Sequence, residues 1–240
     1  MYDRIQRWFG NGWMGIAELL LTALCVFLSL SVHEFAHGYA AYKMGDDTAK
    51  NLGRLNISPM SHLDPIGAVC LFLFGFGWAK PVPVNPRNFN SRKYKSGMVI
   101  TSLAGPLSNI ILAFISFLIL SGIAWYSVGW TELSLVAFRI LTVVIVLLQT
   151  LTIMNISLAV FNLLPIPPLD GSKILNAVLP ARLYFKIMQY ERYGFIILII
   201  LINTPIFGRL LGFFQNLLLS GFDWVNYYLF TAIDWVINLI

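Results

Sequence analysis

The chain has 240 residues, of which 58% are hydrophobic and 11% charged, and its formal net charge is +5. A soluble globular domain carries about 25% charged residues, so this composition excludes that class and indicates a polytopic membrane protein. The positive charge does not point to nucleic acid, because basic residues in a membrane protein mark loops retained in the cytoplasm. Both cysteines, Cys25 and Cys70, lie in apolar runs, which favours buried free thiols over a disulfide.

The first hydrophobic segment follows a start with no small-residue cleavage site, so we expect it to stay in the mature protein rather than act as a signal peptide. It is predicted to span the membrane from about Trp13 through Ser31 and to continue as a helix to about Met44. Gly45 follows at once, and glycine just past a helix end is a common stop.

The stretch 53–64 is polar and rich in turn residues, so it is predicted to be non-helical. Residues 65–79 are apolar, but 15 residues with three glycines are short for a full crossing and favour a re-entrant segment. Residues 80–95 have three prolines in their first seven positions, which favours extended or edge-strand structure over helix.

Two further spans are predicted at about 97–125 and 133–164, and the prolines of "PIPPLDG" (165–171) end the second of them. Another apolar stretch starts near Gly194 and is interrupted by "NTP" (203–205). One broken span and a hairpin both fit this pattern. The aromatic-rich tail that follows fits an interfacial helix or a final span.

We therefore expect an all-α polytopic membrane protein of about four to six transmembrane helices. A small membrane-associated β-hairpin or re-entrant region is expected between the first two main spans. Because no soluble segment is long enough for a second folded domain, residues 1–240 are predicted to form a single domain, with its core at 13–175 and C-terminal helices at 194–240.

The basic residues predict the orientation. Of the 16 Lys and Arg residues, eight lie in 43–96 and four in 173–192, whereas the loop between the spans at 97–125 and 133–164 has none. The positive-inside rule places the two basic regions in the cytoplasm. A full crossing by 65–79 would move five basic residues outside, which again favours re-entry. Arg4 and Arg7 conflict weakly with this orientation.

His33, Glu34 and His37 form the pattern H-E-x-x-H at the end of the first span. On a helix, positions i and i+4 share a face, so both imidazoles can bind one metal ion, and Glu34 beside them can accept a proton from an activated water. A hydrogen-bonded polar patch is the alternative. Ionisable groups at membrane depth are costly, which favours a functional reason for keeping them.

A catalytic zinc usually takes three protein ligands and leaves a fourth position for water. The long pattern H-E-x-x-H-x-x-G-x-x-H fails, since Lys43 takes the last position, and the next glutamate, Glu132, lies in the opposite loop. His62, Asp64 and Asp170 are the candidates that remain. Asp170 follows the third span on the predicted cytoplasmic side, where the H-E-x-x-H helix also ends.

The segments "HEFAHG" (33–38) and "NLLPIPPLDG" (162–171) together resemble the site-2 protease family of intramembrane zinc metalloproteases. "HLDPIG" (62–67), "GWAKPVPVNPRNF" (77–89) and "AGPLSN" (104–109) are similar to its compact bacterial branch. The resemblance covers about residues 15–175. It implies one Zn²⁺ per chain bound by His33, His37 and Asp170, with Glu34 as general base. It also implies that Asn162 positions or polarises the scissile carbonyl group.

The function that the resemblance implies is hydrolysis of peptide bonds within or near transmembrane segments, in a multi-pass bacterial cell-membrane protein with its active site toward the cytoplasm. Its partners would be a transmembrane protein substrate and the lipid bilayer, with no nucleic acid; the oligomeric state stays open. The extended stretches 53–60 and 80–90 are predicted to pair with an unwound substrate as a sheet edge.

Two other classes compete with the protease. A metal transporter commonly shows internal repeats, and none is found here. A non-catalytic scaffold could lose Glu34 or Asp170, and this chain keeps both. Among the remaining residues, His62 is interpreted as a loop histidine, whereas Gly105 and Asn109 are interpreted as positions of close helix packing.

Overall fold

The computed structural model of the chain describes residues 12–74, 77–90, 94–127 and 134–237. Within these ranges three helices are long and apolar enough to cross a membrane, and there are up to four such spans if a bent helix pair counts as one. The prediction of an all-α membrane protein is confirmed. The prediction of four to six spans holds only at its lower limit.

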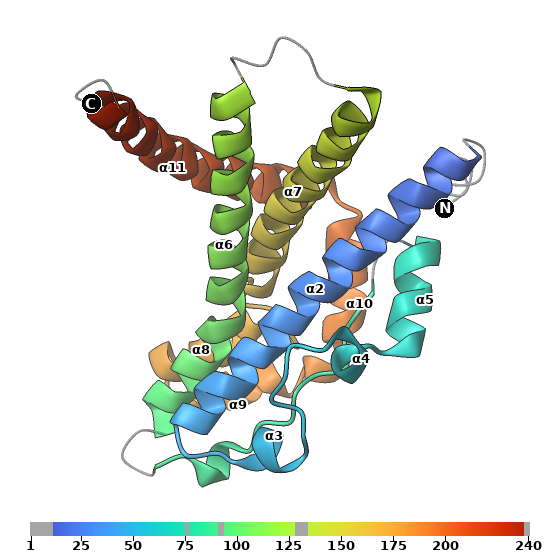
Figure 1. Cartoon of the computed structure of the whole chain (residues 1–240). Coiled ribbons are helices and arrows are strands. Elements are labelled where there is room, and N and C mark those ends of the chain that lie inside the picture. The colour runs from blue at the N-terminus through green and yellow to red at the C-terminus, as the bar shows by residue number, and fades with distance from the viewer. Residues whose placement is uncertain (1–11, 75–76, 91–93, 128–133, 238–240) are drawn as a thin grey trace.

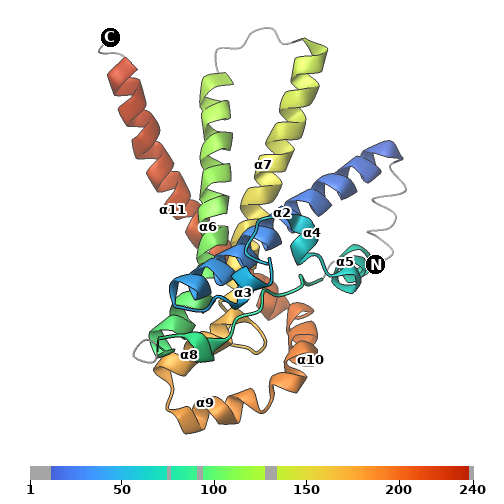
Figure 2. The same cartoon turned by 60° about the horizontal axis from the view of Figure 1, so that its bottom comes forward.

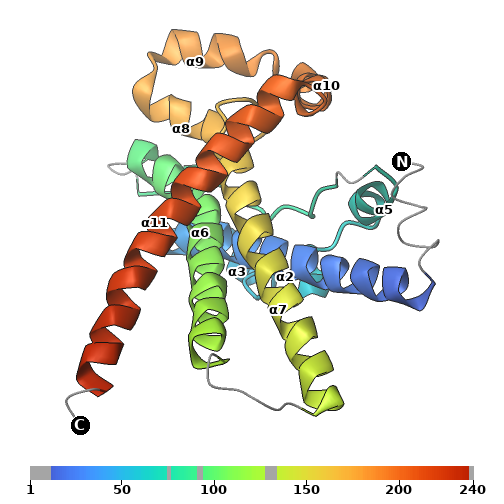
Figure 3. The ribbon, with the colours of Figure 1, turned by 90° about the horizontal axis from the view of Figure 1, so that it is seen from above.

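The three spans are α2 (Trp13–Lys43), α6 (Tyr94–Ser127) and α7 (Leu135–Asn162). Helix α6 packs against both of the others, and α2 runs obliquely across the pair (Figures 1 and 3). Small residues on α6 allow this close approach, since Ala113 is fully buried in a cluster with Ile156 of α7. The predicted spans therefore match the observed helices to within a few residues at their ends.

Helix α2 ends where the sequence predicted. Met44 caps it, and Gly45 follows with φ of +105°, a conformation that L side chains rarely adopt. Two short helices come next, α3 (Thr48–Asn51) and α4 (Pro59–His62).

The two ends of the apolar stretch 65–79 lie together. It begins as α5 (Pro65–Phe74), and an isolated antiparallel bridge pairs Leu63 with Ala79. The Lys80 N–H also donates to the His62 carbonyl oxygen at 2.8 Å. The described ends of this stretch are therefore adjacent, which is compatible with the expected re-entrant segment.

The predicted β-hairpin is wrong for the part of the chain that the structure describes. The bridge between Leu63 and Ala79 is isolated, and residues 80–90 form no strand but end in a single 3-10 turn at Pro86–Asn88. Proline has no N–H to donate to a ladder, and Pro81, Pro83 and Pro86 remove every second or third donor along this segment.

The C-terminal part begins with two short helices, α8 (Asp170–Val178) and α9 (Ala181–Met188), which join α10 (Glu191–Ile202) in an arc at one end of the spans (Figure 2). Helix α11 (Pro205–Ile237) then runs back along the bundle. Helices α10 and α11 meet at 83° across the predicted "NTP" break.

Candidate metal centre

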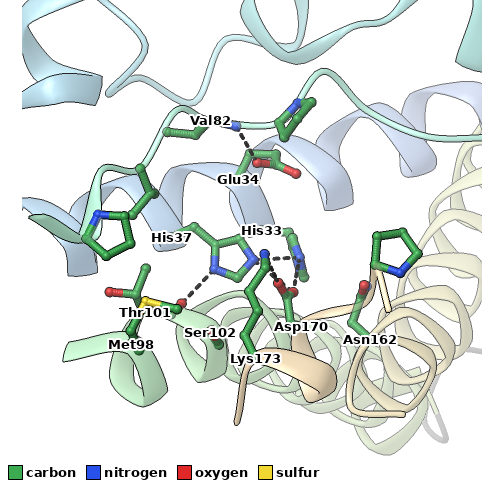
Figure 4. A pocket seen from close by; sticks show the side chains of 14 residues that line it. His33, Glu34, His37, Val82, Met98, Thr101, Ser102, Asn162, Asp170 and Lys173 are labelled. Atoms are coloured by element: carbon green, nitrogen blue, oxygen red, sulfur yellow. Dashed lines mark hydrogen bonds and ion pairs between the residues drawn. The ribbon is translucent and has the colours of Figure 1, made fainter. Parts of the chain in front are cut away.

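Three side chains from two distant parts of the sequence meet at one buried point. His33 and His37 lie one turn apart on α2, and Asp170 is the first residue of α8 (Figure 4). The Oδ2 atom of Asp170 lies 3.2 Å from His33 Nε2 and 3.0 Å from His37 Nε2, and the two Nε2 atoms are 2.9 Å apart. All three residues are buried: the exposed fraction is 4% for His33, 8% for His37 and 6% for Asp170.

The other ring nitrogen of each histidine has an acceptor on α6. His37 Nδ1 donates to the Thr101 carbonyl oxygen at 2.6 Å, and His33 Nδ1 donates to Asn109 Oδ1 at 3.3 Å. A proton on each Nδ1 leaves each Nε2 with a lone pair, and both lone pairs face the Asp170 carboxylate.

Three acceptor atoms this close repel one another unless a proton or a metal cation lies among them. Two ligands each about 2.0 Å from a tetrahedral zinc ion lie roughly 3.3 Å apart, close to the separations observed here. The donor set of His33, His37 and Asp170 therefore fits Zn²⁺. Among the described residues, these three form the cluster of His, Cys, Asp or Glu side chains whose atoms lie close enough together to hold one metal ion.

Asp170 is held as a carboxylate. Burial raises the pKa of this carboxyl group, whereas the positive charge of Lys173 lowers it. Lys173 Nζ lies 3.3 Å from Oδ1, the oxygen that does not face the imidazoles. The Oδ2 atom of Asp170 thus faces the two imidazoles, and its Oδ1 atom faces Lys173 on the same helix.

Two glycines make this approach possible. A Cβ atom at Gly105 would lie 2.3 Å from His37 Nε2 and 2.6 Å from His33 Cε1, so α6 can approach the imidazoles only without a side chain there. A Cβ at Gly171 would lie 2.2 Å from the Leu163 carbonyl oxygen. The glycine after Asp170 therefore lets α8 start directly against the end of α7.

The other two candidates for the third ligand lie elsewhere. His62 is buried under α2 and bonds through Nε2 to the Asn56 carbonyl oxygen at 2.8 Å. Asp64 accepts from the N–H groups of Ile66 and Gly67, both at 2.9 Å, and so caps the start of α5.

Glu34 lies beside the three ligand candidates and has its own partner. Its Oε2 atom accepts a hydrogen bond from the Val82 N–H at 2.8 Å (Figure 4). Together they border a cavity of about 330 Å³ that also contains His33, His37 and Asp170. The cavity brings a carboxylate, a metal-ligand group and open space into contact, which is the arrangement that hydrolysis requires.

Asn162, the last residue of α7, lines the same cavity. One N–H of its amide bonds to the Leu158 carbonyl oxygen of its own helix at 3.0 Å. An amide NH₂ has two donors, so the second can serve a ligand in the cavity.

Residues 21–202 match the family model of peptidase family M50. The chain belongs to this family. It is 42% identical to "Putative zinc metalloprotease YwhC" of Bacillus subtilis over 183 residues, 76% of this chain and 80% of that protein. It is 28% identical to "Putative zinc metalloprotease Rip2" of Mycolicibacterium smegmatis over 215 residues, 85% of this chain and 74% of that protein. No solved structure matches the chain.

The resemblance to site-2 proteases is thus confirmed, and this M50 peptidase is a protease with helices suited to a membrane. The structure adds Thr101 and Asn109 to the site residues, which the sequence did not predict. Interpreting Gly105 and Asn109 as close helix packing was incomplete, because they pack against the imidazoles. Asn109, a polar residue four positions after Gly105 in an apolar span, was the available signal.

Proposed function

We propose that this M50 peptidase is an intramembrane zinc metalloendopeptidase that hydrolyses peptide bonds within or near transmembrane segments. One Zn²⁺ per chain would be held by His33 Nε2, His37 Nε2 and Asp170 Oδ2. The observation that carries the proposal is the convergence of these three buried acceptors within 3.2 Å of one another. The relatives named as zinc metalloproteases support the choice of metal.

A zinc ion held by these three residues would supply a water nucleophile at neutral pH and a Lewis acid for the scissile carbonyl group. Glu34 takes the proton that this water loses and delivers it to the leaving amine. The Val82 N–H holds Oε2 of Glu34, which leaves Oε1 available for the proton. Asn162 contributes the second N–H of its amide to the carbonyl oxygen as negative charge develops there.

The site also has to hold the substrate in an extended form, because the carbonyl groups of a helix are already hydrogen bonded. Residues Pro81, Val82, Val84 and Pro86 line the cavity. The unwound substrate would pair with this segment by strand addition. The stretch 53–60 contributes no lining residue to the cavity in the described part of the chain, so the pairing is proposed for 81–86 alone.

We also propose that the site faces the cytoplasm and that the chain forms a single domain. The basic residues of 43–96 and 173–192 support a cytoplasmic location for the end of α2 that carries the site. Water would then reach the zinc through the cavity from that side. The contacts of α2, α6, α7 and α8 around one site support a single domain.

The test is zinc content together with cleavage in the purified protein. Wild type is expected to hold one zinc per chain and to cleave a membrane-helix substrate. Asp170→Ala should lose the zinc, whereas Glu34→Gln should keep the zinc and lose cleavage. Full zinc in Asp170→Ala would overturn the ligand set. Zinc-loaded wild type that cleaves no membrane-helix substrate would instead favour a metal-binding scaffold.

A further inference from the structure

Residues 80–88, the segment that follows the re-entrant stretch, lie across α2 above Glu34 (Figure 4). Three anchors hold this segment. The first is at its start, where the Lys80 N–H donates to His62 and the Arg54 guanidinium donates to the Lys80 carbonyl oxygen at 2.9 Å. The second is Val82 at Glu34, and the third is at Asn85 and Asn88.

The third anchor is the side chain of Asp46, which is completely buried just after the end of α2. Its Oδ2 accepts from the Asn85 N–H at 2.7 Å, and its Oδ1 accepts from Asn88 Nδ2 at 2.7 Å. The N–H of Thr48 also donates to Oδ1, at 3.1 Å. A single carboxylate thus joins the end of the H-E-x-x-H helix to two residues of the 80–88 segment.

The backbone around Asp46 adds to this connection. Gly45 has φ of +105°, and a Cβ there would lie 3.2 Å from the Asn88 carbonyl oxygen. The Asn90 N–H donates to the Met44 carbonyl oxygen at 3.3 Å. The C-terminus of α2 and the 80–88 segment are therefore in direct contact at this point.

Between the two outer anchors, Val82 packs against α2. Its N–H reaches Glu34, and its buried side chain packs over Gly38, where a Cβ would lie 3.0 Å from Val82 Cγ1. Val82 has prolines on both sides, so in 81–83 it alone has a backbone N–H. The hydrogen bond to Glu34 therefore depends on how the segment is placed, since no neighbouring donor can replace it.

We propose that Asp46 is a positioning residue for the reaction: its carboxylate fixes the 80–88 segment so that the Val82 N–H holds the Glu34 carboxylate. This inference rests on the proposed function. An asparagine at position 46 cannot do the same, because only one of its two side-chain atoms accepts a hydrogen bond, whereas Asp46 accepts through both. One buried donor of the segment would lose its acceptor.

Asp47 provides a matched control. It is the next residue, is exposed, and Asp47→Asn makes the same change in charge and shape. Hydrogen exchange of the zinc-loaded protein in detergent is the first measurement. Asp46→Asn should speed exchange of the Val82 and Asn85 amides by about tenfold, while Asp47→Asn leaves them at the wild-type rate. Equal protection in both variants would overturn the proposal.

Kinetics with a double-mutant cycle are the second measurement. Val82→Pro removes the N–H that reaches Glu34, and Val82→Ala, which keeps the N–H, is its comparator. If Asp46 acts through this N–H, introducing Asp46→Asn into the wild type lowers kcat about tenfold and leaves zinc per chain unchanged. Introducing Asp46→Asn into the Val82→Pro variant then lowers kcat no further. Independent, additive losses in kcat would overturn the proposal.

These outcomes are distinguishable from a failure of the proposed function. Cleavage by Glu34→Gln at the wild-type rate would refute Glu34 as general base without affecting the exchange measurement. Wild-type exchange of the 80–88 amides in Asp46→Asn would refute the positioning role even if the enzyme proves to be a zinc protease.

Discussion

The Nδ1 atom of His37 lies 2.6 Å from the carbonyl oxygen of Thr101, a contact that joins α2 to α6 directly behind the metal centre. On the same helix Asn109 bonds to His33, and Gly105 lies between these two contacts against both imidazoles. Helix α6 therefore sets the orientation of both histidines although none of its residues belongs to the proposed ligand set. Such partners commonly fix the tautomer and the ring orientation of a metal-binding histidine.

Gly105→Ala should strongly weaken zinc binding. The added methyl group would lie 2.3 Å from His37 Nε2 and 2.6 Å from His33 Cε1, so the imidazoles or the helix must move. We expect the zinc affinity to fall by at least about 100-fold, measured by competition with a chromogenic chelator. Gly122→Ala is the control on the same helix, because its Cβ would meet only Phe230 Cζ at 3.8 Å. Wild-type affinity in Gly105→Ala would contradict the arrangement of α6 against the site.

Asn109→Leu should weaken zinc binding without removing it. The substitution leaves His33 Nδ1 without its acceptor and frees the ring to rotate, so the expected loss of affinity is about 10- to 100-fold. Ser116→Ala changes another buried polar residue of α6, one whose hydroxyl group bonds to the Leu112 carbonyl oxygen of its own helix. The same affinity in the two variants would argue against a role for Asn109 at the metal.

Removal of zinc should lower the thermal stability of the protein. A ligand that binds only the folded state stabilises it by about 2.7 kcal/mol when present at 100 times its Kd. The Tm in detergent should therefore rise on zinc addition and fall with a chelator. His62→Ala should keep this zinc-dependent shift, and Asp170→Ala should lose it. A shift retained in Asp170→Ala but lost in His62→Ala would reverse the ligand assignment.

The stabilising effect of Asp46 should depend on pH. Burial alone would raise the pKa of this carboxyl group, but its hydrogen bonds from Thr48, Asn85 and Asn88 outweigh that effect and lower the pKa below its ordinary value of 3.8. A carboxyl group with a lowered pKa in the folded state contributes stability above its unfolded pKa and loses it as the pH falls through the folded pKa.

The difference in Tm between wild type and Asp46→Asn should accordingly be large at pH 7 and shrink when the pH falls below about 3.8. A protonated aspartic acid has nearly the shape of asparagine and, like asparagine, keeps only one oxygen that purely accepts, which is the reason for the convergence. Thermal unfolding of both proteins at pH 7 and pH 3 measures it, with Asp47→Asn as reference. An equal difference at both pH values would show that the charge of Asp46 is unimportant.

Much of the fold could be predicted because long apolar segments in a bilayer have few alternatives to helix. The stop of α2 at Met44 and the break at 203–205 followed from glycine and proline. The β-hairpin was wrongly predicted because an extended, proline-rich sequence such as 80–90 can lie along a helix instead of pairing with another strand. This segment is held by isolated hydrogen bonds to residues such as Glu34, Asp46 and Arg54, which leave no periodic signal.

The sequence by itself determined the membrane class of this protein, and the H-E-x-x-H motif placed His33 and His37 on one face of a helix, since a spacing of four residues acts within a single turn. Tertiary structure decided that Asp170, and neither His62 nor Asp64, lies beside the two histidines. Asp170 is 133 residues from His37, and their meeting depends on the packing of α2, α6 and α8 around two glycines, Gly105 and Gly171. Contacts between distant segments depend on how the helices pack in three dimensions, which local spacing does not encode.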